Sequence, residues 1–338
     1  MGHVQNKRLR TAFLLLWLFS AFPALAQRTQ LRGFFDFVTY YQNNRVGFTL
    51  GEQTLFITSE LNDRFSFLGE TSFRVSPQSP TGFNVAVERL VIKYNYYGNH
   101  NILVGRHHPP VNYWNDVYHR GRIFYPTIEW PLLFNAGIIP LRGTGISFQG
   151  MNLGSLRFGY DLMVTNGLGS GDIIDNDRFK AVTASVHIKP VQELKVMASY
   201  YHDVISQGAI VNDRPIRQQV TQNLLTGSVS YFGKKFELVA EGTSANNQSD
   251  STGGRNTLAS YVYAGVRVAP KFIPYIRFDN IRYSTGEVFY FKDNTTSFVA
   301  GLRYEISYLT VVKLEYQTRN SEVSGSSDAL KAQLAIGF

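Results

Sequence analysis

The sequence predicts an all-β fold: a transmembrane antiparallel β-barrel of about sixteen strands, with a long loop folded inward after the fifth strand. Three observations predict this. Apolar and polar residues alternate along the chain in segments of about ten residues, tight connections alternate with longer ones, and no segment after the N-terminal region has about 18 consecutive apolar residues.

The N-terminal region has the layout of a secretory signal peptide. Lys7, Arg8 and Arg10 precede an apolar run at 11–22, and Ala24-Leu25-Ala26 forms a small-residue cleavage site. The run is too short to span a bilayer, and a buried helix would not need these parts in this order. Residues 1–26 are therefore expected to be cleaved, which leaves 27–338 as the barrel.

Composition narrows the class of protein. Loss of the three signal-peptide cations lowers the formal net charge from +8 to +5, and no run of Lys or Arg indicates nucleic-acid binding. The chain has no Cys, so disulfides and thiolate metal sites are excluded. Mean hydropathy is −0.14, yet aromatic residues reach 14%. Such an exported chain is either a periplasmic β-protein or a barrel whose alternation hides its apolar face.

Period-two alternation is clear at 156–164, 194–201, 298–306, 312–317 and 330–338. The predicted strands are 29–42, 48–60, 64–76, 83–97, 99–108, 142–150, 153–166, 178–188, 192–205, 218–232, 234–245, 256–268, 271–283, 294–305, 308–319 and 326–338. Weak alternation in the sixth and eighth leaves a range of 14–18 strands. An even number lets the first and last strands pair and close the sheet.

The chain ends on Phe338, on the apolar parity of the last strand and at the short-turn end, where an aromatic girdle is expected. A water-soluble β-sandwich remains the alternative, but its connections need not alternate between short and long.

Together the signal peptide, the sixteen alternating strands, the short turns and the terminal Phe resemble a Gram-negative outer-membrane porin. The resemblance implies an integral outer-membrane location, a water-filled channel for small hydrophilic solutes or ions, contact with outer-membrane lipid and a homotrimer. It also implies that Phe338 is part of the signal read by the barrel-assembly machinery. Residues 88–122 are locally similar to porin-like proteins grouped with the phosphate-selective porins.

One connection is much longer than the others. Residues 109–141 contain Trp114, Trp130 and five prolines, and an aromatic-rich segment is expected to pack rather than remain disordered. In general porins the loop at this place folds inward and narrows the pore, so 109–141 is predicted to be the constriction loop. The predicted constriction residues are Arg106, His107, His108, Asp116, His119, Arg120, Arg122, Glu129 and Arg142.

Within this set basic residues outnumber acids, and fixed positive charge in a constriction favours anions. The alternative is that these charges pair with one another and only hold the loop in place. The predicted lumen wall adds Arg157, Lys195, Arg267, Arg277, Arg303, Lys313 and Lys331. Acids on the same parity are Asp36, Glu70, Asp161, Glu237, Glu241, Asp279, Glu305 and Glu315, so the anion preference is expected to be weak.

Other chemistries have weaker support. His107 and His108 are adjacent on a strand and point to opposite faces, so they cannot easily bind one metal ion even with His119 nearby. Ser185 and His187 share a face, but no third triad member is readable. GLGSGD at 167–172 lacks the helix of a phosphate-binding loop. We expect a passive porin with no metal, no cofactor and no enzymatic activity; a plugged structural barrel and, less well supported, an outer-membrane hydrolase remain alternatives.

Overall fold

The computed structural model describes residues 28–338 apart from 77, 119–120, 169–174, 176, 212–213 and 291–292. The predicted signal peptide and two predicted constriction residues, His119 and Arg120, lie outside the described residues. The strands are β1 (Arg28–Gln42), β2 (Arg45–Leu50), β3 (Glu52–Glu60), β4 (Phe65–Val75), β5 (Phe83–Tyr97), β6 (His100–His107), β7 (Gly143–Leu153), β8 (Phe158–Thr165), β9 (Ala181–Val191), β10 (Leu194–Ile205), β11 (Ile210–Val211), β12 (Arg214–Pro215), β13 (Val220–Phe232), β14 (Phe236–Ser249), β15 (Gly253–Val266), β16 (Phe272–Tyr283), β17 (Thr295–Ser307), β18 (Thr310–Ser321) and β19 (Gly325–Gly337).

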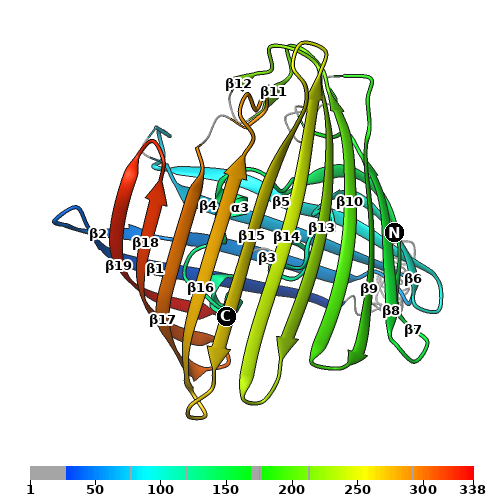
Figure 1. Ribbon diagram of the computed structural model, residues 1–338. Coiled ribbons are helices and arrows are strands. Elements are labelled where there is room, and N and C mark those ends of the chain that lie inside the picture. Colours follow the sequence, from blue (N-terminus) through cyan, green and yellow to red (C-terminus); the bar gives the residue numbers. More distant parts are fainter. Residues whose placement is uncertain are drawn as a thin grey trace, which may run out of the picture.

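The sheet is antiparallel and closes on itself (Figure 1). Around the barrel each strand pairs with its neighbour along the chain, with β10 pairing to β13 past the separate β11–β12 hairpin, and β1 pairs with β19, so that no edge of the barrel is left open to lipid. β2 and β3 both pair with β1 and are separated only by Gly51, so they form one interrupted spanning strand. The barrel is therefore sixteen-stranded, and the predicted fold is confirmed.

Contacts with Asp36 explain why the strand is interrupted at Gly51. Its N–H donates to the backbone carbonyl of Asp36 (2.7 Å), and the next N–H, of Glu52, donates to the Asp36 carboxylate (2.8 Å). An added Cβ at Gly51 would lie 2.1 Å from that carboxylate. The Asp36 carboxylate thus replaces a backbone carbonyl as the acceptor of one hydrogen bond between the strands, and only glycine leaves enough space beside it.

Most strand bounds agree with the sequence to within a few residues, although β14 runs on to Ser249, past its predicted end at 245. The main difference is the turn between β7 and β8, where β7 runs on to Leu153 and β8 starts only at Phe158. Asn152, near the end of β7, and Gly154 and Arg157, in the turn, have positive φ, which departs from regular strand geometry. Arg157 is exposed in this turn, so its assignment to the lumen wall is wrong.

Burial alternates clearly along β10 and β13–β16, as a barrel requires. In β13 the side chains of Gln222, Thr226 and Ser228 are buried, whereas Leu225 and Val229 are exposed. Polar residues thus face the interior and apolar residues face outward, where a membrane would supply the apolar surroundings. Among the described residues, no helix is both long and apolar enough to cross a membrane.

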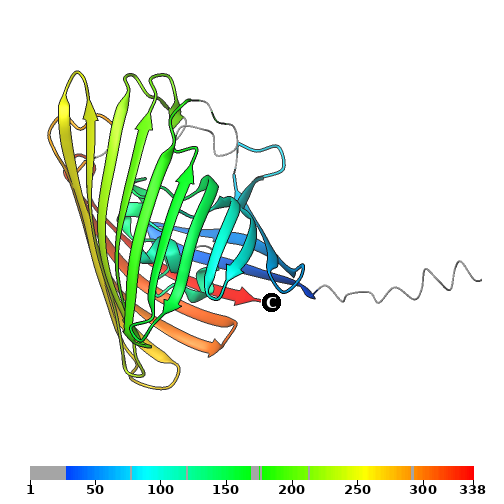
Figure 2. The same ribbon diagram turned by 90° about the vertical axis from the view of Figure 1, so that its right-hand side faces the viewer.

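The longer connections, including the small β11–β12 hairpin, gather at one end of the barrel, and the tight turns lie at the other (Figures 1 and 2). The chain ends beside β1 at the tight-turn end. The N–H and the carbonyl of Phe338 both bond to Gly33 at 2.9 Å. A Cβ added to Gly33 would lie 2.2 Å from the Phe338 ring, so the ring covers this glycine and packs across the closing seam.

The seam predicts a measurable coupling between Phe338 and Gly33. Phe338→Ala should lower the free energy of unfolding by about 1 kcal/mol, because a cross-strand aromatic contact is lost. Gly33→Ala should destabilise the wild type, because its methyl group collides with the ring, but not the Phe338→Ala variant. The readout is the temperature at which the folded band on a semi-native gel converts to the unfolded band.

Gly242→Ala is the matched control, because a Cβ there would meet nothing within 4 Å. Equal penalties for Gly33→Ala in both backgrounds would show that the ring does not cover Gly33.

Candidate pore constriction

The connection between β6 and β7, residues 108–142, lies inside the ring of strands and is called the inner segment (Figures 1 and 2). It contains α2 (Tyr113–Val117), the short 3-10 helix η1 (Arg122–Phe124) and α3 (Leu132–Asn135). Asn112 caps α2 by accepting the N–H of Asn115. Five prolines prevent longer helices from forming, so the segment crosses the barrel interior as short helices joined by irregular turns.

An apolar cluster fixes one face of the inner segment to the wall. Trp114, Leu133 and Ile138 are almost fully buried and belong to the same cluster as Tyr201 of β10 and Tyr261 of β15. The rings of Trp114 and Tyr261 meet edge to face at 6.0 Å. The aromatic content of the segment is thus used in packing against strands β10–β16.

Glu241 of β14 holds the start of α2. Its two carboxylate oxygens accept the backbone N–H groups of Tyr113 (2.7 Å) and Trp114 (3.1 Å). The hydroxyl of Ser228 donates to it at 2.5 Å, and the hydroxyl of Tyr261 donates as well. Both N–H groups belong to the first turn, where a helix has no internal acceptor, so a wall carboxylate completes the helix.

Two further carboxylates accept N–H groups later in the segment. Glu315 of β18 accepts the N–H of Ile128 (2.6 Å) and the hydroxyl of Tyr275 (2.8 Å). Asp279 of β16 accepts the N–H of Leu132, the first residue of α3, at 3.0 Å. All three carboxylates are on the parity that the sequence assigned to the lumen.

Two buried cations bind the carbonyls of the same stretch. Arg277, 1% exposed, donates to the Thr127 hydroxyl (2.6 Å) and to the carbonyls of Glu129 (2.7 Å) and Trp130 (3.3 Å). Lys313 is fully buried and donates to the carbonyls of Arg122 (2.7 Å) and Thr127 (3.2 Å). These two residues were predicted as solvated lumen charges, but they are instead anchors of the inner segment.

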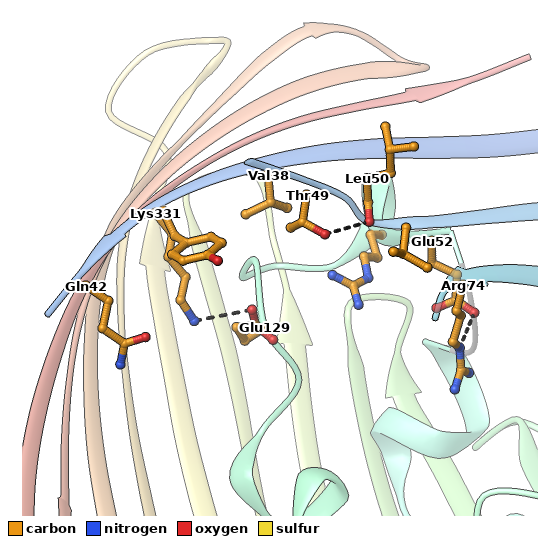
Figure 3. A pocket seen from close by; sticks show the side chains of 12 residues that line it. Val38, Gln42, Thr49, Leu50, Glu52, Arg74, Glu129 and Lys331 are labelled. Atoms are coloured by element: carbon orange, nitrogen blue, oxygen red, sulfur yellow. Dashed lines mark hydrogen bonds and ion pairs between the residues drawn. The ribbon is translucent and has the colours of Figure 1, made fainter. Parts of the chain in front are cut away.

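Four predicted constriction charges form ion pairs with the wall rather than with one another. Asp116 contacts Lys195, Glu129 contacts Lys331 at 3.2 Å, Arg122 lies 3.6 Å from Asp36, and Arg142 lies 2.7 Å from Glu88. Figure 3 shows Glu129 reaching from the inner segment towards Lys331. These pairs link the segment to β1, β5, β10 and β19.

The remaining predicted residues lie at the margins of the segment. Arg106 and His107 are the last two residues of β6, both are buried, and the His107 imidazole contacts the Ser147 hydroxyl at 3.1 Å. The His108 ring bonds to the carbonyl of Leu141 at 2.5 Å, which joins the two ends of the segment.

Arg303 and Arg267 lie towards the tight turns and share partners. Arg303 of β17 pairs with Glu237 at 2.6 Å and with Glu305 at 3.2 Å. Arg267 sits in the turn after β15, not on a strand, and pairs with Glu305 at 2.8 Å. Both arginines are therefore held by acids of the neighbouring wall.

The sequence did not predict Glu52 and Glu88. Arg74 contacts both, at 3.2 and 3.1 Å, and Ser72 donates to Glu88 at 2.6 Å. Glu88 lies where the β4–β5 register shifts, since Glu70 pairs with Arg89 but Thr71 with Val87. The extra residue at this bulge breaks the alternation, so a strict period-two reading misassigns it. The polar pair Glu88-Arg89 inside an apolar strand was the available signal.

Two cavities lie beside the inner segment. The first, of about 470 Å³, is lined by residues of β1–β4, β19 and the segment, with charged side chains from β3, β4, β19 and the segment, and is called the charged cavity. The second, of about 540 Å³, lies towards the tight turns and is called the aromatic cavity. Its ring-bearing lining residues are Tyr118, Phe124, Tyr125, Phe232 and Tyr308. Arg122 lines the first cavity and the next residue, Ile123, the second, so η1 separates them.

Two other chemistries have no support in the part of the chain that the structure describes. No group of three His, Cys, Asp or Glu residues suited to a metal ion occurs among these residues. Ser185 and His187 lie on β9 and both point into the barrel interior, where the His187 ring packs over Gly159. No hydrogen bond between Ser185 and His187 is present there.

Solved structures resemble most of the chain. The anion-selective porin from Comamonas acidovorans superposes with a TM-score of 0.68 at 13% identity, covering 92% of this chain and 100% of its own. The trimer form of OmpT, an outer membrane protein of Vibrio cholerae, gives 0.66 at 12%, covering 93% and 100%. The chain has the porin fold.

Salmonella typhi OmpF, solved with daunomycin, gives a TM-score of 0.65 at 14% identity over 92% of this chain and 98% of its own. No protein-family model and no curated protein matches the sequence. At these identities the likeness concerns the fold, so the residues of the constriction have to be judged on their own contacts.

The Glu241 contacts predict release of the inner segment. Glu241→Ala removes the carboxylate that accepts two helix N–H groups and two hydroxyls, of which only the Tyr113 N–H keeps another acceptor, the Ser228 hydroxyl at 3.2 Å. The loss should destabilise the segment by about 3 kcal/mol. Trp114 is buried in this region, so we expect a red shift of tryptophan emission and faster proteolysis within 108–142.

Glu193→Ala is the control, because Glu193 is exposed in a tight turn. A Glu241→Ala variant with unchanged emission and cleavage would show that the apolar cluster alone holds the segment.

The Glu129–Lys331 pair predicts a pH response. Burial raises the pKa of the Glu129 carboxyl, but Lys331 and Arg122 more than offset this, so its pKa falls below the ordinary value of 4.5. A depressed carboxyl pKa stabilises the fold above the unfolded-state value, and this contribution is lost as pH falls through the folded-state value. Trp130 emission should therefore change with a midpoint below pH 4.5, and Glu129→Gln should remove that transition. A midpoint above 4.5 would contradict the pairing.

Proposed function

We propose that the chain is an integral protein of a bacterial outer membrane that forms a passive, water-filled channel for small hydrophilic solutes. The observation that carries the proposal is a closed sixteen-stranded barrel with a polar interior, in which the inner segment leaves cavities on two sides. Sixteen strands enclose more space than their own side chains fill. Among the structural neighbours, one is an anion-selective porin and another is an outer membrane protein, which supports the same role.

The mechanism needs no energy source and no cofactor. Closed pairing satisfies the backbone polar groups in lipid, the outward apolar side chains contact the bilayer, and the inner segment limits the size of solutes. The proposal assigns the chain no catalytic activity, metal or nucleic-acid partner. Its partners would be lipid, the barrel-assembly machinery acting on the terminal strand with Phe338, and two further copies in a homotrimer, as in the trimer form of OmpT.

The anion preference is the finer part of the proposal. Arg122 and Arg142 pair with Asp36 and Glu88, so counting charges leaves little net excess at the described constriction. Exposure is unequal, however, because these acids are at most 2% exposed while the arginines keep 23% and 16%. A modest preference for anions follows from the more accessible positive groups.

The second candidate is a plugged barrel with a structural or surface-binding role. It is favoured by the apolar cluster and by the wall charges that bind the inner segment's backbone. A plug and a constriction share these contacts and differ only in whether water passes beside the segment.

Single-channel recording in planar bilayers separates the two. We expect stable open steps from refolded protein, and in a salt gradient a reversal potential with the sign of weak anion preference. A protein that is folded, as shown by its heat-modifiable mobility on a gel, but gives no conductance would contradict the channel function and support the plugged barrel. Ser185→Ala, tested for loss of any hydrolytic activity, addresses the remaining enzymatic alternative.

A further inference from the structure

The charged cavity combines accessible cations with buried acids. Its basic lining residues, Arg74, Arg122 and Lys331, keep 41%, 23% and 15% of their side chains exposed. The acids that pair with the two arginines are hidden: Glu52 is 5% exposed and Asp36 is 2% exposed. At the two arginines, water in this cavity therefore meets positive groups whose counter-charges lie behind them in the wall.

Hydrogen-bonding capacity is left over on these cations. Arg74 uses its Nε and one Nη for Glu52 and Glu88, so its other Nη donors are not engaged by the protein. Arg122 meets Asp36 at 3.6 Å, which is longer than a hydrogen bond, and 23% of its side chain is exposed. A planar oxyanion accepts such donors well, because guanidinium and carboxylate match edge to edge.

Part of the remaining cavity wall is apolar. Val38 and the Tyr40 ring line it on the inward parity, and Gln42 and Thr49 add neutral polar groups. Leu50 and Val75 also border the cavity, but their side chains are on the outward parity and are exposed. A fully hydrated inorganic anion gains nothing from apolar walls, whereas a short hydrocarbon body does. The cavity thus suits an anion whose charge is at one end and whose body is apolar.

One acid opposes anion binding. Glu129 lines the cavity with 31% of its side chain exposed and holds Lys331 at 3.2 Å (Figure 3). An incoming carboxylate competes with Glu129 for Lys331, which keeps binding weak enough for release. Conduction requires such weak binding, because a solute that binds tightly blocks the channel.

We propose that the charged cavity is a binding subsite for small monocarboxylates with a short apolar body, held by Arg74, Arg122 and Lys331. The proposal rests on the channel function and names its preferred class of solute. The carboxylate lies against the two arginines, the body against Val38 and the Tyr40 ring, and Glu129 sets the affinity by competing for Lys331.

The test uses full-length refolded protein in a planar bilayer in potassium chloride, with butyrate added as the probe. Butyrate should lower single-channel conductance in a saturable manner, while butyramide, of the same shape without the charge, should not. Arg74→Gln should raise the half-blocking concentration of butyrate at least about threefold, because one accessible charge is lost. Glu129→Gln should lower it by a similar factor, because Lys331 becomes available.

Arg282→Gln is the matched control, because Arg282 is exposed in β16 and does not line the charged cavity. Equal effects of butyrate and butyramide, or a block unchanged by both Arg74→Gln and Glu129→Gln, would overturn the subsite while the conducting channel stands.

Titration calorimetry of butyrate against the detergent-solubilised protein separates the two proposals. A silent protein that binds butyrate and loses binding in Arg74→Gln would retain the subsite and overturn the channel. A silent protein that does not bind butyrate would overturn both.

Discussion

The arrangement of the interior depends on wall side chains that bind backbone groups of the inner segment. A polypeptide that crosses a barrel has many N–H and carbonyl groups that neither a sheet nor a long helix satisfies. Glu241, Glu315 and Asp279 accept N–H groups, while Arg277 and Lys313 donate to carbonyls. Because the two sets have opposite charge and alternate around the segment, they also neutralise one another in a poorly hydrated region. The same residues thus fix the position of the inner segment and balance the charge around it.

Other residues have different roles. The apolar cluster around Trp114 packs the inner segment against the wall. Ion pairs between the segment and the wall, such as Glu129 with Lys331, are partly exposed to water. Residues that anchor the segment are buried, whereas residues that meet solutes are partly exposed. Charge sign alone therefore says little about selectivity in such a lumen, and the exposure of each charged group matters more.

Much of the fold could be predicted because a membrane barrel imposes a strict period of two. Sixteen spanning strands, the closing pair and the outward parity of Leu330, Leu334 and Ile336 follow from that period. The errors lie where the period breaks, as at the bulge beside Glu88 and in the positive-φ turn containing Arg157. The lumen parity of Arg277 and Lys313 was predictable, but their burial against the inner segment was not. Alternation fixes the face of a side chain, but not what packs over it.

The anchors of the inner segment also order the steps of folding. The segment is made between β6 and β7, yet Trp114 bonds to Glu241 across 127 residues, Ile128 to Glu315 across 187, and Glu129 to Lys331 across 202. These partners exist only when the C-terminal half of the barrel is in place, and contacts of such range form late. The inner segment therefore gains its final contacts only after the C-terminal strands have joined the barrel, and a partly assembled barrel carries an aromatic-rich segment whose partners are still missing.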